Sequence, residues 1–241
     1  MTAARAAAAL TLLLASPVLA GPPYDTDDPQ PTELHHWEIY NFVAGARAEG
    51  SLDGAAGVDL NYGGFREVQL TATLPLGFSR AAGERFRAGA SDVELGIKAR
   101  LYHDEKEGLA FSVFPRAILP TGSRAFGGRR IRLLLPVWAE KDSGPWSVFG
   151  GGGFELNPGA GNRDFWIAGV AVTREFGERL SVGAELFHQG PDSRDARPET
   201  RLGLGATAAL GGPYSLLVSG GPSFSAGHVG AHGYAALGLS F

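Results

Sequence analysis

The strongest constraint on the fold of this chain is the alternation of apolar and polar side chains along most of its length. Residues 93–101, with the sequence VELGIKARL, are one example, because every second residue is apolar. A period of two is typical of a β-strand, in which successive side chains point to opposite faces. The pattern therefore predicts an all-β chain. It recurs in about twelve segments, which are residues 37–46, 52–62, 67–78, 92–102, 109–119, 130–140, 146–156, 164–174, 180–188, 201–210, 214–220 and 229–241.

The lengths of these segments and of their connections distinguish two kinds of all-β fold. Most segments are close to the roughly 9–11 residues that a tilted strand needs to cross a membrane, whereas soluble strands are most often about five or six residues long. Short connections such as 63–65 alternate with longer ones such as 79–91, although the connection at 47–51 is a short exception. Outer-membrane barrels sort their turns and loops in this way. The expected fold over residues 36–241 is a transmembrane antiparallel up-and-down β-barrel of about twelve strands.

Composition agrees with a barrel and excludes several other classes of protein. The chain has 36 glycines, roughly 15% against an average near 7%, and glycine disfavours helices. There is no cysteine, which excludes disulfides and thiolate metal ligands. The formal net charge is −4, so no basic surface for nucleic acid is expected.

The first twenty residues have the organisation of a secretory signal peptide. Arg5 precedes an apolar run at residues 6–15, and Pro17 and Ala20 follow it. The run is too short to span a bilayer of about 30 Å, which disfavours the alternative of an N-terminal membrane anchor. We predict a signal peptide at residues 1–20 that is cleaved near Gly21. Residues 21–35 are rich in Pro and Asp, and we predict an extended periplasmic segment there.

The charged residues within the alternating segments define the candidate lumen. A barrel in lipid satisfies its backbone hydrogen bonds internally and presents an apolar face outward, so the polar face must look inward. Both signs of charge occur on that face, which predicts weak ion selectivity. A barrel of about twelve strands lies between filled and open barrels, and we favour a narrow or plugged pore. The candidate lumen-lining residues are Asp53, Asp59, Glu67, Glu94, Lys98, Arg100, Arg116, Arg132, Glu140 and Glu185.

The C-terminal strand carries a second kind of signal. Phe241 ends the chain, and Leu239 and Leu237 lie on the same face. This resembles the terminal strand of outer-membrane proteins, and the resemblance implies recognition by the barrel-assembly machinery. The expected location is the bacterial outer membrane, with lipid around the barrel.

Two motifs near the predicted mature start resemble a known family. They are TDDP at residues 26–29 and HWE at 36–38, and the LPTG motif at 119–122 agrees with them. The chain is similar here to the family called MetA pathway of phenol degradation, whose members are transporter-like outer-membrane barrels. The resemblance implies a barrel and leaves a role in phenol metabolism open.

Residues that could carry catalysis or bind a metal do not form a recognisable motif. Asp25, Asp27 and Asp28 could ligate a hard cation, but a calcium-loop pattern is absent. His188 could act with a serine from another strand in a lipid hydrolase, which requires a nucleophile and base within hydrogen-bond reach. No motif singles out such a pair, so neither a cofactor nor an enzymatic activity is expected.

The sequence thus favours a narrow channel or transporter for small molecules, with hydrophobic or aromatic solutes as candidates. A closed structural or sensory barrel is the main alternative. An outer-membrane lipid hydrolase and a soluble secreted β-sandwich are weaker alternatives.

Overall fold

The computed structural model describes residues 23–241, so the predicted signal peptide at residues 1–20 lies outside the described residues. Within them no helix is long and apolar enough to cross a membrane. The strands are β1 (Trp37–Ala48), β2 (Ser51–Phe65), β3 (Val68–Arg80), β4 (Arg87–Ala90), β5 (Val93–Asp104), β6 (Leu109–Val113), β7 (Arg116–Leu119), β8 (Arg132–Ser143), β9 (Trp146–Leu156), β10 (Phe165–Glu175), β11 (Leu180–Gln189), β12 (Glu199–Gly211), β13 (Tyr214–Ser225) and β14 (His228–Ser240).

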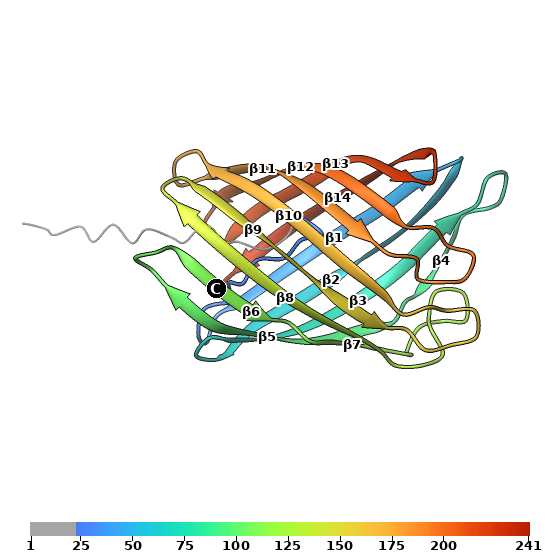
Figure 1. The fold of residues 1–241 in the computed structure, drawn as a ribbon, viewed down its shortest axis with the longest axis horizontal. Coiled ribbons are helices and arrows are strands. Elements are labelled where there is room, and N and C mark those ends of the chain that lie inside the picture. The colour runs from blue at the N-terminus through green and yellow to red at the C-terminus, as the bar shows by residue number, and fades with distance from the viewer. Residues whose placement is uncertain (1–22) are drawn as a thin grey trace, which may run out of the picture.

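The strands form one closed antiparallel barrel (Figure 1). The first strand, β1, pairs with β2 on one side and with β14 on the other, which closes the sheet. Strands β4 and β5 follow one another along β3, and β6 and β7 follow one another along β8. The fourteen strands therefore occupy twelve positions around the wall, and the predicted fold class is confirmed.

The two interrupted positions have local causes. Pro115 separates β6 from β7, because proline has no N–H to give to a sheet. Its carbonyl still accepts the N–H of Ile97 at 3.1 Å, so the wall stays bonded there. The other interruption, between β4 and β5, contains Asp92, whose carboxylate accepts the backbone N–H groups of Gly122 and Gly128. This contact ties the loop between β7 and β8 to the barrel wall.

The two ends of the barrel differ in their connections. The C terminus lies at the end with the short turns, and the longer loops gather at the opposite end (Figure 1). One expected loop, residues 221–228, is instead mostly strand, since β13 runs to Ser225 and β14 starts at His228. The sequence GGP at 220–222 interrupts the apolar alternation there, yet the ladder continues through Pro222, which lies opposite Ala231.

The two faces of the wall separate apolar from polar side chains along β5. Leu95, Ile97 and Leu101 are 45%, 50% and 69% exposed, whereas Lys98 is 3% exposed. In a single-walled barrel a buried side chain has to point inward, so the apolar residues face outward. A charge on such an outer face costs up to about 2–4 kcal/mol at the bilayer midplane, which explains the parity.

The interior also contains an apolar cluster that the sequence interpretation did not anticipate. Trp138 lies at its centre and is fully buried. Six more buried residues, from β7, β8, β10 and β11 and the β6–β7 break, complete it: Phe114, Ile118, Leu134, Phe165, Ile167 and Phe187. One part of the inner wall is therefore apolar, while the part formed by β2, β3 and β5 carries buried polar side chains, among them Asn61, Gln69 and Lys98.

Candidate functional site: a segment inside the barrel

The N-terminal segment before β1 lies inside the barrel. Thr26, Asp28 and Pro29 are among the most deeply buried residues of the described chain. The sequence predicted an extended periplasmic segment at residues 21–35, and the structure instead places residues 23–32 against the inner wall. The Pro and Asp content indicates an irregular polar segment, but it does not tell whether that segment lies inside the lumen or outside the barrel. In the description below, this stretch of residues 23–32 is called the inner segment.

Ion pairs hold the inner segment to opposite sides of the wall. Lys98 on β5 places its Nζ 2.9 Å from Asp27 Oδ1 and donates to the carbonyl of Gln30 at 3.2 Å. Arg201 on β12 places Nη1 3.0 Å from Asp25 Oδ2. Because Lys98 is almost fully buried, its charge must be compensated, and the segment supplies that compensation.

Hydrogen bonds to the segment backbone add to these ion pairs. Glu185 on β11 accepts the N–H of Asp25 at 3.2 Å and that of Thr26 at 2.5 Å. On the other side, Gln69 Oε1 accepts the N–H of Thr32 at 2.8 Å. Buried backbone donors are costly when unpaired, so wall side chains at these positions stabilise the docked segment.

Glycines on the inner face make room for the segment. A Cβ at Gly169 on β10 would collide with the Thr26 hydroxyl. Cβ atoms at Gly183 and Gly205 would lie 2.6 Å from the Tyr24 hydroxyl oxygen and 2.7 Å from its Cε1, respectively. A side chain at any of the three would occupy the space of the segment. Inward-facing glycines on adjacent strands are the sequence signal that could have indicated an occupied lumen.

Four of the ten candidate lumen residues contact the inner segment directly. Lys98 and Glu185 do so as described, and both Arg100 and Glu140 bond to the side chain of Gln30. The bond from Gln30 Nε2 to Glu140 Oε2 is 2.6 Å long. The structure therefore brings these four together around residues of the chain that the sequence interpretation had placed outside the barrel.

The remaining candidates lie elsewhere on the wall. Three of them form ion pairs along the wall. Glu94 and Arg116 pair with each other at 3.3 Å, and Arg132 pairs at 3.0 Å with Glu155, which was not a candidate. Asp59 accepts the Thr73 hydroxyl at 2.9 Å, Glu67 lies in the turn between β2 and β3 and pairs with Arg100, and Asp53 is exposed. Sequence reasoning missed Tyr24, Gln30, Gln69 and Arg201. The first two lie outside the alternating segments and Gln69 is uncharged, whereas the parity of Arg201 with Leu202 and Leu204 is a signal that could have identified it.

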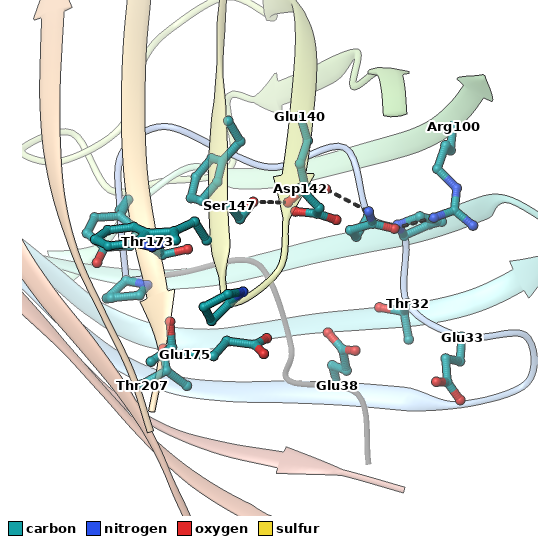
Figure 2. A pocket seen from close by; sticks show the side chains of 18 of the residues that line it. Thr32, Glu33, Glu38, Arg100, Glu140, Asp142, Ser147, Thr173, Glu175 and Thr207 are labelled. Atoms are coloured by element: carbon teal, nitrogen blue, oxygen red, sulfur yellow. Dashed lines mark hydrogen bonds between the residues drawn. The ribbon is translucent and has the colours of Figure 1, made fainter. Parts of the chain in front are cut away.

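Two cavities lie beside the inner segment. The larger, about 670 Å³, opens at the short-turn end, and we call it the vestibule. Figure 2 shows four of the residues around it, which are Thr32 of the inner segment, Glu33 directly after that segment, Glu38 of β1 and Glu175 of β10. The smaller, about 150 Å³, lies deeper and is lined by Asp27, Lys98 and Arg116. Tyr24, Gln30 and Glu38 line both cavities, so the segment forms the partition between them.

Asp28 makes docking of the segment sensitive to pH. Burial raises the pKa of its carboxyl to about 8, Lys98 opposes this rise, and Asp27 and Glu140 add to it. A solvated aspartate has a pKa of about 3.9, so the docked state binds more protons than the withdrawn state between these values. Docking is therefore expected to weaken as the pH rises from about 4 to about 8.

A cysteine reporter tests this expectation. The chain has no cysteine, so Thr26→Cys creates a single thiol whose alkylation reports exposure of the segment. We compare the alkylation rate of this reporter with that of the same reporter carrying Asp28→Asn, whose amide cannot ionise. We expect the ratio of the two rates to rise between pH 5 and pH 8.5, because ionisation of Asp28 weakens docking only in the first protein. The ratio removes the titration of the thiol itself. A ratio that stays constant with pH would contradict the role of Asp28.

The structure also shows where the residues named for metal binding and for hydrolysis lie. Within residues 23–241 no group of three or more His, Asp or Glu side chains is placed to hold a metal ion. His188 Nδ1 lies 2.8 Å from Thr200 Oγ1, and its ring stacks on Trp166 at 4.7 Å. The aspartates of the TDDP motif pair with Lys98 instead of forming a cation site.

Comparison with known proteins supports the fold. No family model matches the chain, and no curated protein matches it. Among solved structures, an outer-membrane channel from Pseudomonas putida F1 is similar with a TM-score of 0.72 and 14% identity, over 90% of this chain and 100% of that one. The translocator domain of the autotransporter NalP from Neisseria meningitidis has a TM-score of 0.54 and 15% identity, over 86% and 88%. At these identities the likeness establishes a shared outer-membrane barrel fold.

Proposed function

We propose that this chain is a narrow outer-membrane channel for small molecules whose bore is restricted by its own N-terminal segment. The observation that carries the proposal is the closed twelve-position barrel with the inner segment ion-paired across its lumen. Barrels of about eight strands are filled by side chains, whereas larger ones leave space for solutes. In this barrel the space is occupied by a segment that is continuous with β1 and anchored by polar contacts. Such a segment can leave the lumen without breaking the strand ladder.

The inner surface supports a preference for solutes with apolar parts. The apolar cluster around Trp138 occupies one part of the inner wall, and charged side chains occupy another. Small-molecule sites are mostly apolar with a few placed polar groups. This mixture suits hydrophobic or aromatic molecules better than simple ions. The TDDP and HWE motifs fit the same proposal, because Asp27, Asp28 and Glu38 lie around the lumen, and membership of the phenol-degradation family is part of the proposal.

Conductance in planar lipid bilayers tests the proposed channel. Purified full-length mature protein is expected to give small, discrete current steps that open and close as the segment moves. A folded protein, identified by heat-modifiable migration on gels, that gives no steps would favour the alternative of a closed structural or sensory barrel. Recovery from outer-membrane fractions tests the proposed location. Deleting Phe241 should lower that recovery if the assembly machinery reads the last strand.

A further inference from the structure

Five basic side chains that are buried or half-buried on the inner wall are all paired, and this leaves an excess of carboxylates. Lys98, Arg100, Arg116, Arg132 and Arg201 each have a carboxylate partner within the described chain, at 2.9–3.3 Å where the contact is of ordinary length. Glu38 instead accepts the Tyr40 hydroxyl at 3.1 Å, and Glu140 accepts from Ser147 at 2.8 Å and from Gln30. Neither Glu38 nor Glu140 has a basic partner within 4.0 Å among residues 23–241. Carboxyl groups on the inner wall therefore outnumber the basic groups that pair with them.

The excess is concentrated in the vestibule. Six carboxylates and two arginines line this cavity. Arg100 forms an ion pair with Glu67, so the other five carboxylates share the cavity with one remaining arginine, Arg66. Those five are Glu33, Glu38, Glu140, Asp142 and Glu175 (Figure 2). Glu33, Asp142 and Glu175 are exposed to water, so their charges need no burial, whereas Glu38 and Glu140 are 9% and 5% exposed. A buried carboxylate without a cation is unfavourable, and a bound cation would offset that cost.

The other walls of the vestibule are apolar and aromatic. Tyr24 and Phe149 line it with their ring centroids 6.1 Å apart, and Pro31, Leu34 and Pro145 extend the apolar surface. Aromatic faces attract cations within about 6 Å of the ring centroid. The cavity volume of about 670 Å³ falls within the range of small-molecule pockets, roughly 300–1,000 Å³.

We propose that the vestibule binds small organic cations, with the ammonium group among Glu38, Glu140 and Glu175 and the apolar body against Tyr24 and Phe149. A bare metal ion needs several oxygens converging at coordination distance, and no group of three or more acidic or histidine side chains within residues 23–241 is so placed. Dispersed carboxylates beside aromatic rings suit a larger, diffuse cation. This inference rests on the barrel and its cavity and goes beyond the proposed channel function.

Calorimetric titration of the purified full-length mature barrel tests the inference with three probes of similar size. Benzyltrimethylammonium is the cation, benzyl alcohol is neutral and benzenesulfonate is the anion. We expect saturable binding of the cation alone. Equal binding of the anion or of the alcohol would overturn the proposal, as would the absence of cation binding.

Matched variants locate the site. Glu38→Gln with Glu175→Gln removes two vestibule charges, and Glu105→Gln with Glu178→Gln removes two charges in turns that do not line the cavity. We expect the first pair to weaken cation binding about tenfold or more, and the second to leave it unchanged. Heat-modifiable migration identifies folded samples. If the double variant does not fold, Glu175→Gln alone takes its place, because this residue is exposed, and we expect it to cause a smaller loss of affinity. Equal affinities of the two pairs would overturn the proposal. Calorimetric titration does not depend on conductance. A barrel that binds the cation but never conducts would therefore contradict the proposed channel function and leave the proposed cation site standing.

Discussion

Removal of residues 24–31 is expected to raise the single-channel conductance at least severalfold. These residues form the partition between the vestibule and the deeper cavity. The wall does not depend on them, because the β1–β14 ladder closes the barrel from Glu38 onward. Excision therefore opens the bore without removing a strand. Planar-bilayer recordings of the deletion and of the parent protein give the measurement, and an unchanged conductance in a folded deletion variant would show that the segment does not limit the current.

A reversible tether provides the matched control for the excision. The Cβ of Thr26 lies 3.1 Å from the position of a Cβ added at Gly169, slightly closer than the roughly 3.5–4.5 Å found in disulfides. The chain has no cysteine, so Thr26→Cys with Gly169→Cys allows a single intramolecular disulfide. We expect the oxidised protein to stay at its lowest conductance and reduction to restore opening. Each single-cysteine variant should respond to neither treatment.

Replacement of Lys98 by methionine is expected to release the inner segment. Lys98 is 3% exposed, and its Nζ lies 2.9 Å from Asp27 Oδ1 and 3.9 Å from Asp28 Oδ1. Removing one partner of a buried ion pair costs about 3–5 kcal/mol, because the remaining charge is left unpaired. The segment can avoid this cost by withdrawing into water, whereas the strand ladder cannot. Alkylation of the Thr26→Cys reporter should therefore accelerate about a hundredfold or more.

Two further variants separate loss of the ion pair from general damage. Lys106→Met removes an exposed lysine in the β5–β6 turn, and we expect it to leave the alkylation rate unchanged. Adding Asp27→Asn and Asp28→Asn to Lys98→Met removes the carboxylate that Lys98 paired with, together with its ionisable neighbour, and should return the rate toward that of the parent. If Lys98→Met accelerates labelling and the triple variant does not reverse it, the ion pair is not what holds the segment.

Much of the wall could be predicted from the sequence, since strand parity is a local property. The alternation of Leu95, Ile97 and Leu101 with Lys98 and Arg100 is visible within ten residues, and it correctly separates the exposed face from the buried one. The breaks were harder to anticipate. Pro115 interrupts a strand position without opening the wall, because the neighbouring strands supply bonds on both sides of it.

The candidate site could be predicted only in part. Lys98, Arg100, Glu140 and Glu185 were identified as inward-facing because their parity is local. Their partners could not be identified, because Asp27 is 71 residues from Lys98 and Asp25 is 176 residues from Arg201. The apolar cluster around Trp138 was also missed, because an inward apolar residue and a lipid-facing one look alike in a strand pattern.

The sequence by itself therefore determined an antiparallel barrel with an apolar outer face, because lipid requires the same two-residue period in every strand. Only the tertiary structure decided what fills the lumen. An irregular polar segment has no period of its own, and its place follows from complementarity with charges and glycines that folding assembles from distant strands. The same assembly decided which charges are paired, and hence that carboxylates remain in excess in the vestibule.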